Sequence, residues 1–108
     1  MKFRLLEDLE DDLINKNNHK KQIISTIRNG LTEQGFKENE ELNGVAFNKD
    51  IEIADTIFYC EFYLDLDNNK YKSYVSNDSD NKVMFTQEGN IDDATKALEI
   101  FIDFLNSI

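Results

Sequence analysis

The chain has 108 residues and contains no proline, no tryptophan, one cysteine and one histidine. The single cysteine, Cys60, excludes an internal disulfide. No apolar run approaches the ~20 residues of a membrane span. Glu7 and Asp8 interrupt the start of the chain before a secretory apolar segment could form. These shortages predict a cytoplasmic protein that makes no contact with membranes.

Residues suited to catalysis or to holding a cofactor are also scarce. His19 lies in a polar stretch, and no second histidine or cysteine stands at zinc-ligand spacing. The chain has no serine in a nucleophile-elbow context and no glycine-rich loop that could cradle phosphate. Cys60 falls on the apolar side of a predicted strand, which favours an inert buried thiol. We therefore predict a protein that is not an enzyme and has no cofactor.

One stretch resembles the front half of a calcium loop, with oxygen-bearing side chains at Asp65, Asp67 and Asn69. A calcium loop that starts at Asp65 requires glycine at its sixth position and glutamate at its twelfth, where this chain has Lys70 and Ser76. Asp and Asn are equally suited to the turn of a β-hairpin. We predict a hairpin turn here and no metal site.

The apolar residues have helical spacing before Gly35 and again after Asn90. The first segment predicts either one helix over residues 3–34 or two helices separated near residues 15–18. Gly35 is expected to end it, and Asn90 to cap the final helix. That final helix has a wider apolar face than one sheet requires. The face either contacts both the sheet and an N-terminal helix or also forms a homodimer.

Between these segments the apolar pattern has the period of two that strands require. Short turns rich in Asn and Asp, including residues 77–81, separate the segments and favour an antiparallel meander. The predicted fold is α+β: an N-terminal helix or helix pair, a meander of about three to five strands, and a C-terminal helix packed on the sheet. One domain spans residues 1–108. The strand candidates are residues 42–48, 51–54, 56–66, 70–76 and 82–86.

Charge is the strongest indication of function. The net charge is −10 and the sequence pI is near 4.4, so the chain repels nucleic acid and anionic membranes and attracts basic surfaces. Residues 16–30 carry four basic and no acidic side chains, whereas residues 31–69 carry ten acids and two bases. The acidic field therefore belongs to the middle of the chain, together with the first residues.

Three groups of residues are candidates for binding a partner. Two are acidic clusters, which could be solvated surface or could occupy a basic groove built for nucleic acid. The third is the polar side of the longest predicted strand, where tyrosine alternates with carboxylate. The candidates are Glu7, Asp8, Glu10, Asp11 and Asp12; then Glu38, Glu40 and Glu41, with Asp50, Glu52 and Asp55 nearby; and finally Tyr59, Glu61, Tyr63 and Asp65.

Frequent isoleucine and asparagine, and lysine in excess of arginine, indicate coding by AT-rich DNA, as in low-GC bacteria, their phages and mobile elements. We expect a small acidic binding protein that inhibits a basic partner. Its most concrete form is a phage or mobile-element inhibitor of a host nucleic-acid enzyme, of the anti-CRISPR or anti-restriction type, acting in the host cytoplasm. The alternative is an immunity protein for a toxin nuclease. A small enzyme or a calcium-responsive module is a further class.

Overall fold

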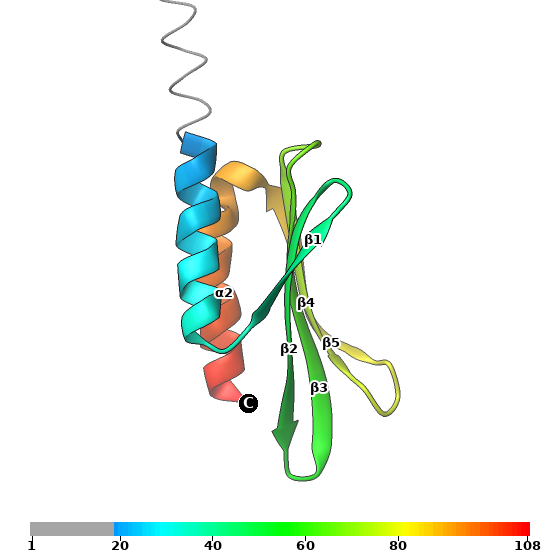
Figure 1. Cartoon of the computed structure of the whole chain (residues 1–108). Coiled ribbons are helices and arrows are strands. Elements are labelled where there is room, and N and C mark those ends of the chain that lie inside the picture. The colour runs from blue at the N-terminus through cyan, green and yellow to red at the C-terminus, as the bar shows by residue number, and fades with distance from the viewer. Residues whose placement is uncertain (1–18) are drawn as a thin grey trace, which may run out of the picture.

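The computed structural model describes residues 19–108, which form a five-stranded sheet with a helix before it and a helix after it (Figure 1). The first helix covers residues 19–33 of this range. The strands are β1 (Lys37–Glu41), β2 (Gly44–Ile53), β3 (Thr56–Asp65), β4 (Lys70–Asn77) and β5 (Val83–Asn90). A 3-10 turn at Ile91–Asp93 leads into helix α2 (Ala94–Ser107). The predicted α+β fold is confirmed. The break that would divide residues 3–34 into two helices is predicted near residues 15–18, which lie outside the described residues.

The sheet is an antiparallel meander in which every strand pairs with its neighbours in sequence, in the order β1-β2-β3-β4-β5. The register sets Phe47 opposite Phe62, and Phe62 opposite Ser73. Because side chains alternate between the two faces of a strand, this register collects the apolar residues of several strands on one face. The other face receives Tyr59, Tyr63 and Tyr74 and most of the charged residues of the sheet, whereas Tyr71 is buried on the helix side.

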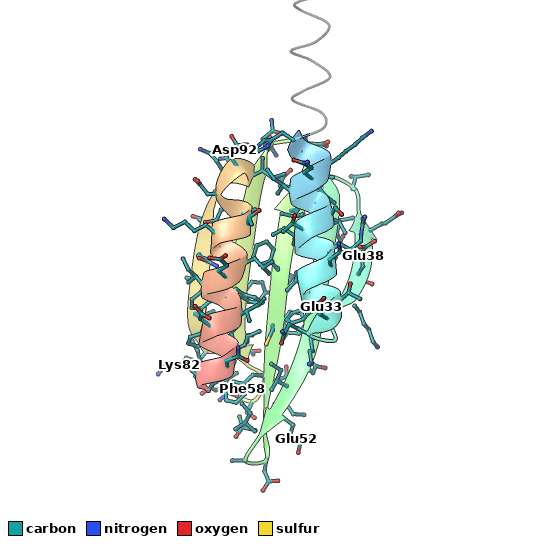
Figure 2. All side chains as sticks on the ribbon, turned by 90° about the vertical axis from the view of Figure 1, so that its left-hand side faces the viewer. Glu33, Glu38, Glu52, Phe58, Lys82 and Asp92 are labelled. Carbon is teal, nitrogen blue, oxygen red and sulfur yellow. The ribbon has the colours of Figure 1, made fainter. Side chains whose placement is uncertain are left out.

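Both helices cover the same face of the sheet and run side by side in the same direction (Figures 1 and 2). Phe101 of α2 lies at the centre of the core, with its ring 5.6 Å from that of Phe62 and 5.8 Å from that of Phe36. The two helices approach closely at Gly30, where a Cβ atom would lie 2.9 Å from Leu98 Cδ2. The predicted contact of α2 with both the sheet and the first helix is therefore confirmed.

The first helix ends as the sequence predicts, at Gly35. This residue has φ of +85°, a conformation that glycine adopts without a steric penalty. The amide of Phe36 donates to the carbonyl of Leu31, and the amide of Gly35 donates to that of Thr32, which is the Schellman arrangement. The Lys49 ammonium donates to the carbonyl of Gln34 and so places a positive charge at the helix C-terminus.

The sequence-based boundaries were wrong in the first hairpin. The sequence predicts no strand over residues 37–41, yet these residues form β1, and Leu42 lies in the turn and is 98% exposed. Residues 42–48 and 51–54 were expected to be separate strands, but Gly44–Ile53 is continuous. The cause is pairing: every residue of β1 is exposed and the strand has no apolar alternation, so its hydrogen bonds to β2 determine its conformation.

The boundary before the last helix also differs from the prediction. Asn90 is the final residue of β5, and its side chain makes no capping hydrogen bond to the 3-10 turn that follows. The α-helix starts only at Ala94, one turn later than expected. The amide of Ile91 instead donates to the carbonyl of Asn69, so a backbone contact with the β3–β4 turn holds this end of the helix.

Candidate interaction surface

The face of the sheet opposite the helices, here called the open face, is covered by no element within residues 19–108 (Figure 1). Its centre is β3, whose alternating residues Tyr59, Glu61, Tyr63 and Asp65 all point to this side. The sequence predicts these four residues as one surface, and the structure places them together on one strand. The residues that flank them are Glu41 of β1; Ala46, Asn48 and Asp50 of β2; and Lys70, Lys72 and Tyr74 of β4.

Two tyrosines form an aromatic pair at the middle of the open face, and a third lies on the same strand as one of them. The rings of Tyr59 and Tyr74 lie 5.8 Å apart on neighbouring strands, and the Tyr59 hydroxyl donates to Glu61 at 3.0 Å. Tyr63 lies on the same face, opposite Ala46, which is only 2% exposed. Tyr74 is not among the binding residues predicted from the sequence. The signal was available, because Tyr74 alternates with Lys70 and Lys72 in a predicted strand.

The phenol groups on this face all stay protonated to higher pH than a free tyrosine. Burial, followed by the hydrogen bond to Glu61, raises the pKa of Tyr59. Burial and the carboxylate of Glu61 raise the pKa of Tyr74. For Tyr63, burial and then the carboxylates of Asp65 and Glu41 raise the pKa. A protonated phenol can donate a hydrogen bond and the neighbouring carboxylates can accept one, a combination suited to binding basic and amide groups.

Negative charge on the open face is concentrated over β1, β2 and β3. Five carboxylates lie there against one cation, Lys37, whereas the lysines of β4 are the cross-strand neighbours of Asp65 and of Glu88 in β5. Neighbouring strands lie about 4.8 Å apart, so these side chains can meet a single partner together. The five carboxylates are Glu41, Asp50, Glu52, Glu61 and Asp65.

The structure divides the second acidic cluster between the two faces. Glu38 pairs in register with Phe47, and Glu40 with Val45, so both lie on the side of the helices. Glu38 forms an ion pair with Arg28 of the first helix. Glu41 lies on the open face. Glu38 and Glu40 therefore do not belong to the surface formed by the β3 residues. The other acidic cluster, Glu7, Asp8, Glu10, Asp11 and Asp12, lies outside the described residues.

The two hairpin turns rich in Asp and Asn are stabilised by their own side chains. Asp65 accepts hydrogen bonds from the backbone and the side chain of Asn68, at 3.1 and 2.9 Å, and Asn69 has φ of +56°. These bonds from Asn68 lower the pKa of the Asp65 carboxyl. The predicted hairpin turn is confirmed. In the second turn, Asn77 and Asp80 accept from the amides of Ser79 and Lys82.

Cys60 lies in the core and His19 lies on the surface. Cys60 is fully buried under the helices, and burial raises the pKa of its thiol to about 11, so it is protonated at neutral pH. His19 is exposed, and its Nε2 lies 3.5 Å from Asp92 Oδ1 at the other helix start. Across residues 19–108, no three His, Cys, Asp or Glu side chains gather in a group that could hold a metal ion.

A hollow of about 370 Å³ opens at one border of the open face. It lies where β1 starts beside β2 and where the first helix ends. Its lining comes from the helix terminus, β1, β2 and β3: Gly35, Lys37, Asn48, Lys49, Asp50 and Tyr59. Tyr59 and Asp50 thus belong both to the hollow and to the open face.

Neither helix within residues 19–108 has the length and apolar character that crossing a membrane requires. Comparison of the chain with protein-family models, with curated proteins and with solved structures found no match.

Proposed function

We propose that this protein is a non-catalytic binding protein whose open face holds a basic surface of another protein. The observation that supports it is the combination on β3 and its neighbours of three tyrosines with a one-sided excess of carboxylates. Tyrosine contributes rigid apolar area together with a hydroxyl, and it is enriched at the centres of interfaces. Carboxylates around it attract a basic partner and align it.

The concrete form of the proposal is inhibition of a nucleic-acid enzyme. Such an enzyme exposes a basic groove that holds phosphates, and carboxylates on the open face can occupy the same positions. Residues two apart on one strand lie about 6.6 Å apart, and neighbouring strands about 4.8 Å apart. This gives a grid of charges on the scale of phosphate spacing. The amino-acid composition indicates coding by AT-rich DNA, which supports a phage or mobile-element source. Such a source favours an inhibitor of anti-CRISPR or anti-restriction type acting in the host cytoplasm.

An immunity protein that caps a toxin nuclease is the second candidate. The same surface would serve it, because a toxin nuclease also has a basic groove. The two functions differ in the partner: a host enzyme in the first case, and a toxin encoded beside this protein in the second. Identification of the captured protein distinguishes them.

The test is capture of basic proteins from a lysate of the host, followed by release with competing DNA or RNA. A variant with Glu41→Lys, Asp50→Lys and Glu61→Lys reverses three of the five carboxylates of the open face. A matched control, Glu33→Lys, Glu99→Lys and Asp103→Lys, makes the same change in net charge on exposed positions of the two helices. We expect the first variant to lose the partner and the control to retain it, and nucleic acid to compete with the wild-type protein.

The kinetics should separate the contribution of charge from that of the tyrosines. Charge reversal on the open face should mainly slow association, and added salt should do the same, because the Debye length is only ~8 Å at physiological ionic strength. The double variant Tyr59→Ala, Tyr63→Ala should mainly speed dissociation. Equal loss of capture in the open-face variant and in the helix control would show that only net charge matters. That result would contradict the proposal.

A further inference from the structure

The outer edge of β2 has a step. β1 pairs with β2 only from Gly44 to Asn48, where Lys37 is opposite Asn48, and β2 continues to Ile53. Within residues 19–108, no strand lies beside residues 49–53 on that side. This part of β2 and the start of β3 project past the ends of both helices, with Glu52 near the tip (Figures 1 and 2).

The hydrogen-bond pattern shows which backbone groups face outward at this step. Gly44 is opposite Asp65 in the register. One residue further along, Asn43 faces Leu66, and the amide of Leu66 donates to the carbonyl of Asn43 at 2.9 Å. Gly44 therefore directs its own amide and carbonyl away from β3. The register with β3 continues without a shift, so Asn48, Asp50 and Glu52 do the same. Asn48 meets Lys37, whereas Asp50 and Glu52 present their backbone groups to the space beyond β1.

We infer that this edge accepts an extended basic segment of the partner protein, added as a strand in line with β1 and antiparallel to β2. This inference rests on the proposed function, because it specifies how a basic partner docks beside the open face. The hollow lined by Gly35, Lys37, Asn48, Lys49, Asp50 and Tyr59 lies at the same step, where β1 begins. Strand addition of this kind obtains its affinity from main-chain hydrogen bonds and its selectivity from alternate side chains.

The side chains of the edge determine the chemistry of the segment. Asp50 and Glu52 point to the open face, so the residues opposite them are lysine or arginine. Between them, Ile51 points to the helix side and is only partly buried, so its opposite residue is apolar. A second copy of this chain does not fit. Symmetric antiparallel pairing about Ile51 would set Asp50 opposite Glu52 of the copy, and like charges opposed across strands destabilise pairing.

The test uses the full chain and a blocked peptide of about seven residues in which lysine and valine alternate. The control is the same peptide with N-methyl groups on the lysine amides, which removes the hydrogen bonds to β2 and keeps the charge. Amide exchange measured by NMR should show the amides of Asp50 and Glu52 unprotected in the protein alone and protected with the peptide. The amide of Ile51, which faces β3, should be protected in both states. The control peptide should bind at least about tenfold more weakly.

A pair of variants separates the contribution of the Glu52 backbone amide to peptide binding from that of its carboxylate. Glu52→Gln removes the carboxylate and keeps the outward amide, whereas Glu52→Pro removes the amide as well, at an edge position where proline is tolerated. We expect Glu52→Pro to weaken peptide binding by about a further tenfold. If Glu52→Pro disturbs the fold, the comparison of methylated and unmethylated peptides decides alone.

Several results would overturn the inference. Equal binding of the two peptides is one, and peptide-induced protection at Thr86 and Glu88 of β5 is another. Protection of Asp50 and Glu52 that depends on protein concentration alone would identify a second copy as the occupant. If the peptide does not protect the amides of Asp50 and Glu52 while charge reversal on the open face still abolishes capture, the proposed function stands without this docking mode. If the peptide protects the edge and the same charge reversal leaves capture intact, the proposed function fails and the edge remains a peptide site.

Discussion

Gly44 lies directly against the carbonyl oxygen of Leu64: a Cβ atom on Gly44 would be 1.9 Å from that oxygen. Gly44 is the first residue of β2 and follows the two-residue turn formed by residues 42 and 43, whereas Leu64 lies near the end of the neighbouring strand β3. No side chain fits in this space without movement of the β3 backbone. The carbonyl of Asn43 also accepts hydrogen bonds from the amides of Leu66 and Asp67, which fix the end of β3 to the start of β2.

Gly44→Ala should therefore reduce the free energy of unfolding by about 3 kcal/mol, because a backbone atom must move to admit the methyl group. Chemical denaturation measures the loss. Gly89→Ala is the matched control, since its Cβ would meet only the ring of Tyr71, at 3.0 Å, and a side chain yields more easily than backbone. Equal losses in the two variants would show that the contact with Leu64 is not the cause.

A substitution in the turn between β2 and β3 should increase the stability of the fold. Ala54 and Asp55 have φ of +50° and +66°, which alanine adopts at a steric cost and asparagine or glycine adopts readily. Ala54→Asn should raise the free energy of unfolding by about 0.5–1 kcal/mol. The reverse change at an equivalent site, Asn81→Ala, should lower it, since Asn81 has φ of +57°. A stability unchanged in both variants would contradict the assignment of strain to Ala54.

Ser73 is buried in the core, and among residues 19–108 its hydroxyl is the one buried side-chain polar atom without a hydrogen-bond partner. A buried polar group without a partner destabilises the fold, and alanine has a similar volume. Ser73→Ala should therefore be neutral or stabilising by up to about 1 kcal/mol. Ser76→Ala on the open face serves as the control and should have little effect. A large loss of stability in Ser73→Ala would show that the hydroxyl has a bonding partner in solution.

The lowered pKa of Asp65 predicts a pH dependence of stability. Because the carboxyl is more acidic in the folded chain than in the unfolded one, it stabilises the fold fully at pH values above the unfolded value of about 3.9. That contribution declines as the pH falls through the lower, folded value. Asp65→Asn should thus destabilise at neutral pH, and its difference from the parent should shrink in acid. Asp103→Asn on the exposed side of α2 makes the same change of charge and is the control variant.

Calcium should have almost no effect on thermal stability at millimolar concentration. Both oxygens of Asp65 already accept hydrogen bonds from Asn68, and Lys70 and Ser76 stand where a calcium loop needs glycine and glutamate. The measurement is the thermal unfolding midpoint without divalent ions, with calcium, and with magnesium as the control, all at equal ionic strength. A rise of several degrees with calcium, abolished by Asp67→Ala, would contradict the prediction.

Features that depend on neighbours in sequence could be predicted from the sequence alone. Gly35 followed by Phe36 predicted the helix end, because a left-handed residue and an apolar one after it are a local requirement. The alternation in residues 56–66 predicted which side of β3 carries Tyr59 and Tyr63, and Asn68 and Asn69 marked the turn that follows. The acidic net charge, and with it the expected sign of the partner's charge, also needed no structure.

Features that depend on pairing between distant residues were decided only by the tertiary structure. β1 has no pattern of its own, and it is a strand because β2 supplies its hydrogen bonds. The register then separates Glu38 from Glu41, places Tyr74 beside Tyr59, and leaves Asp50 and Glu52 at an open edge. A shift of one residue would move each side chain to the other face. The composition of the chain would be the same in either register, so only the fold determines which carboxylates share a surface.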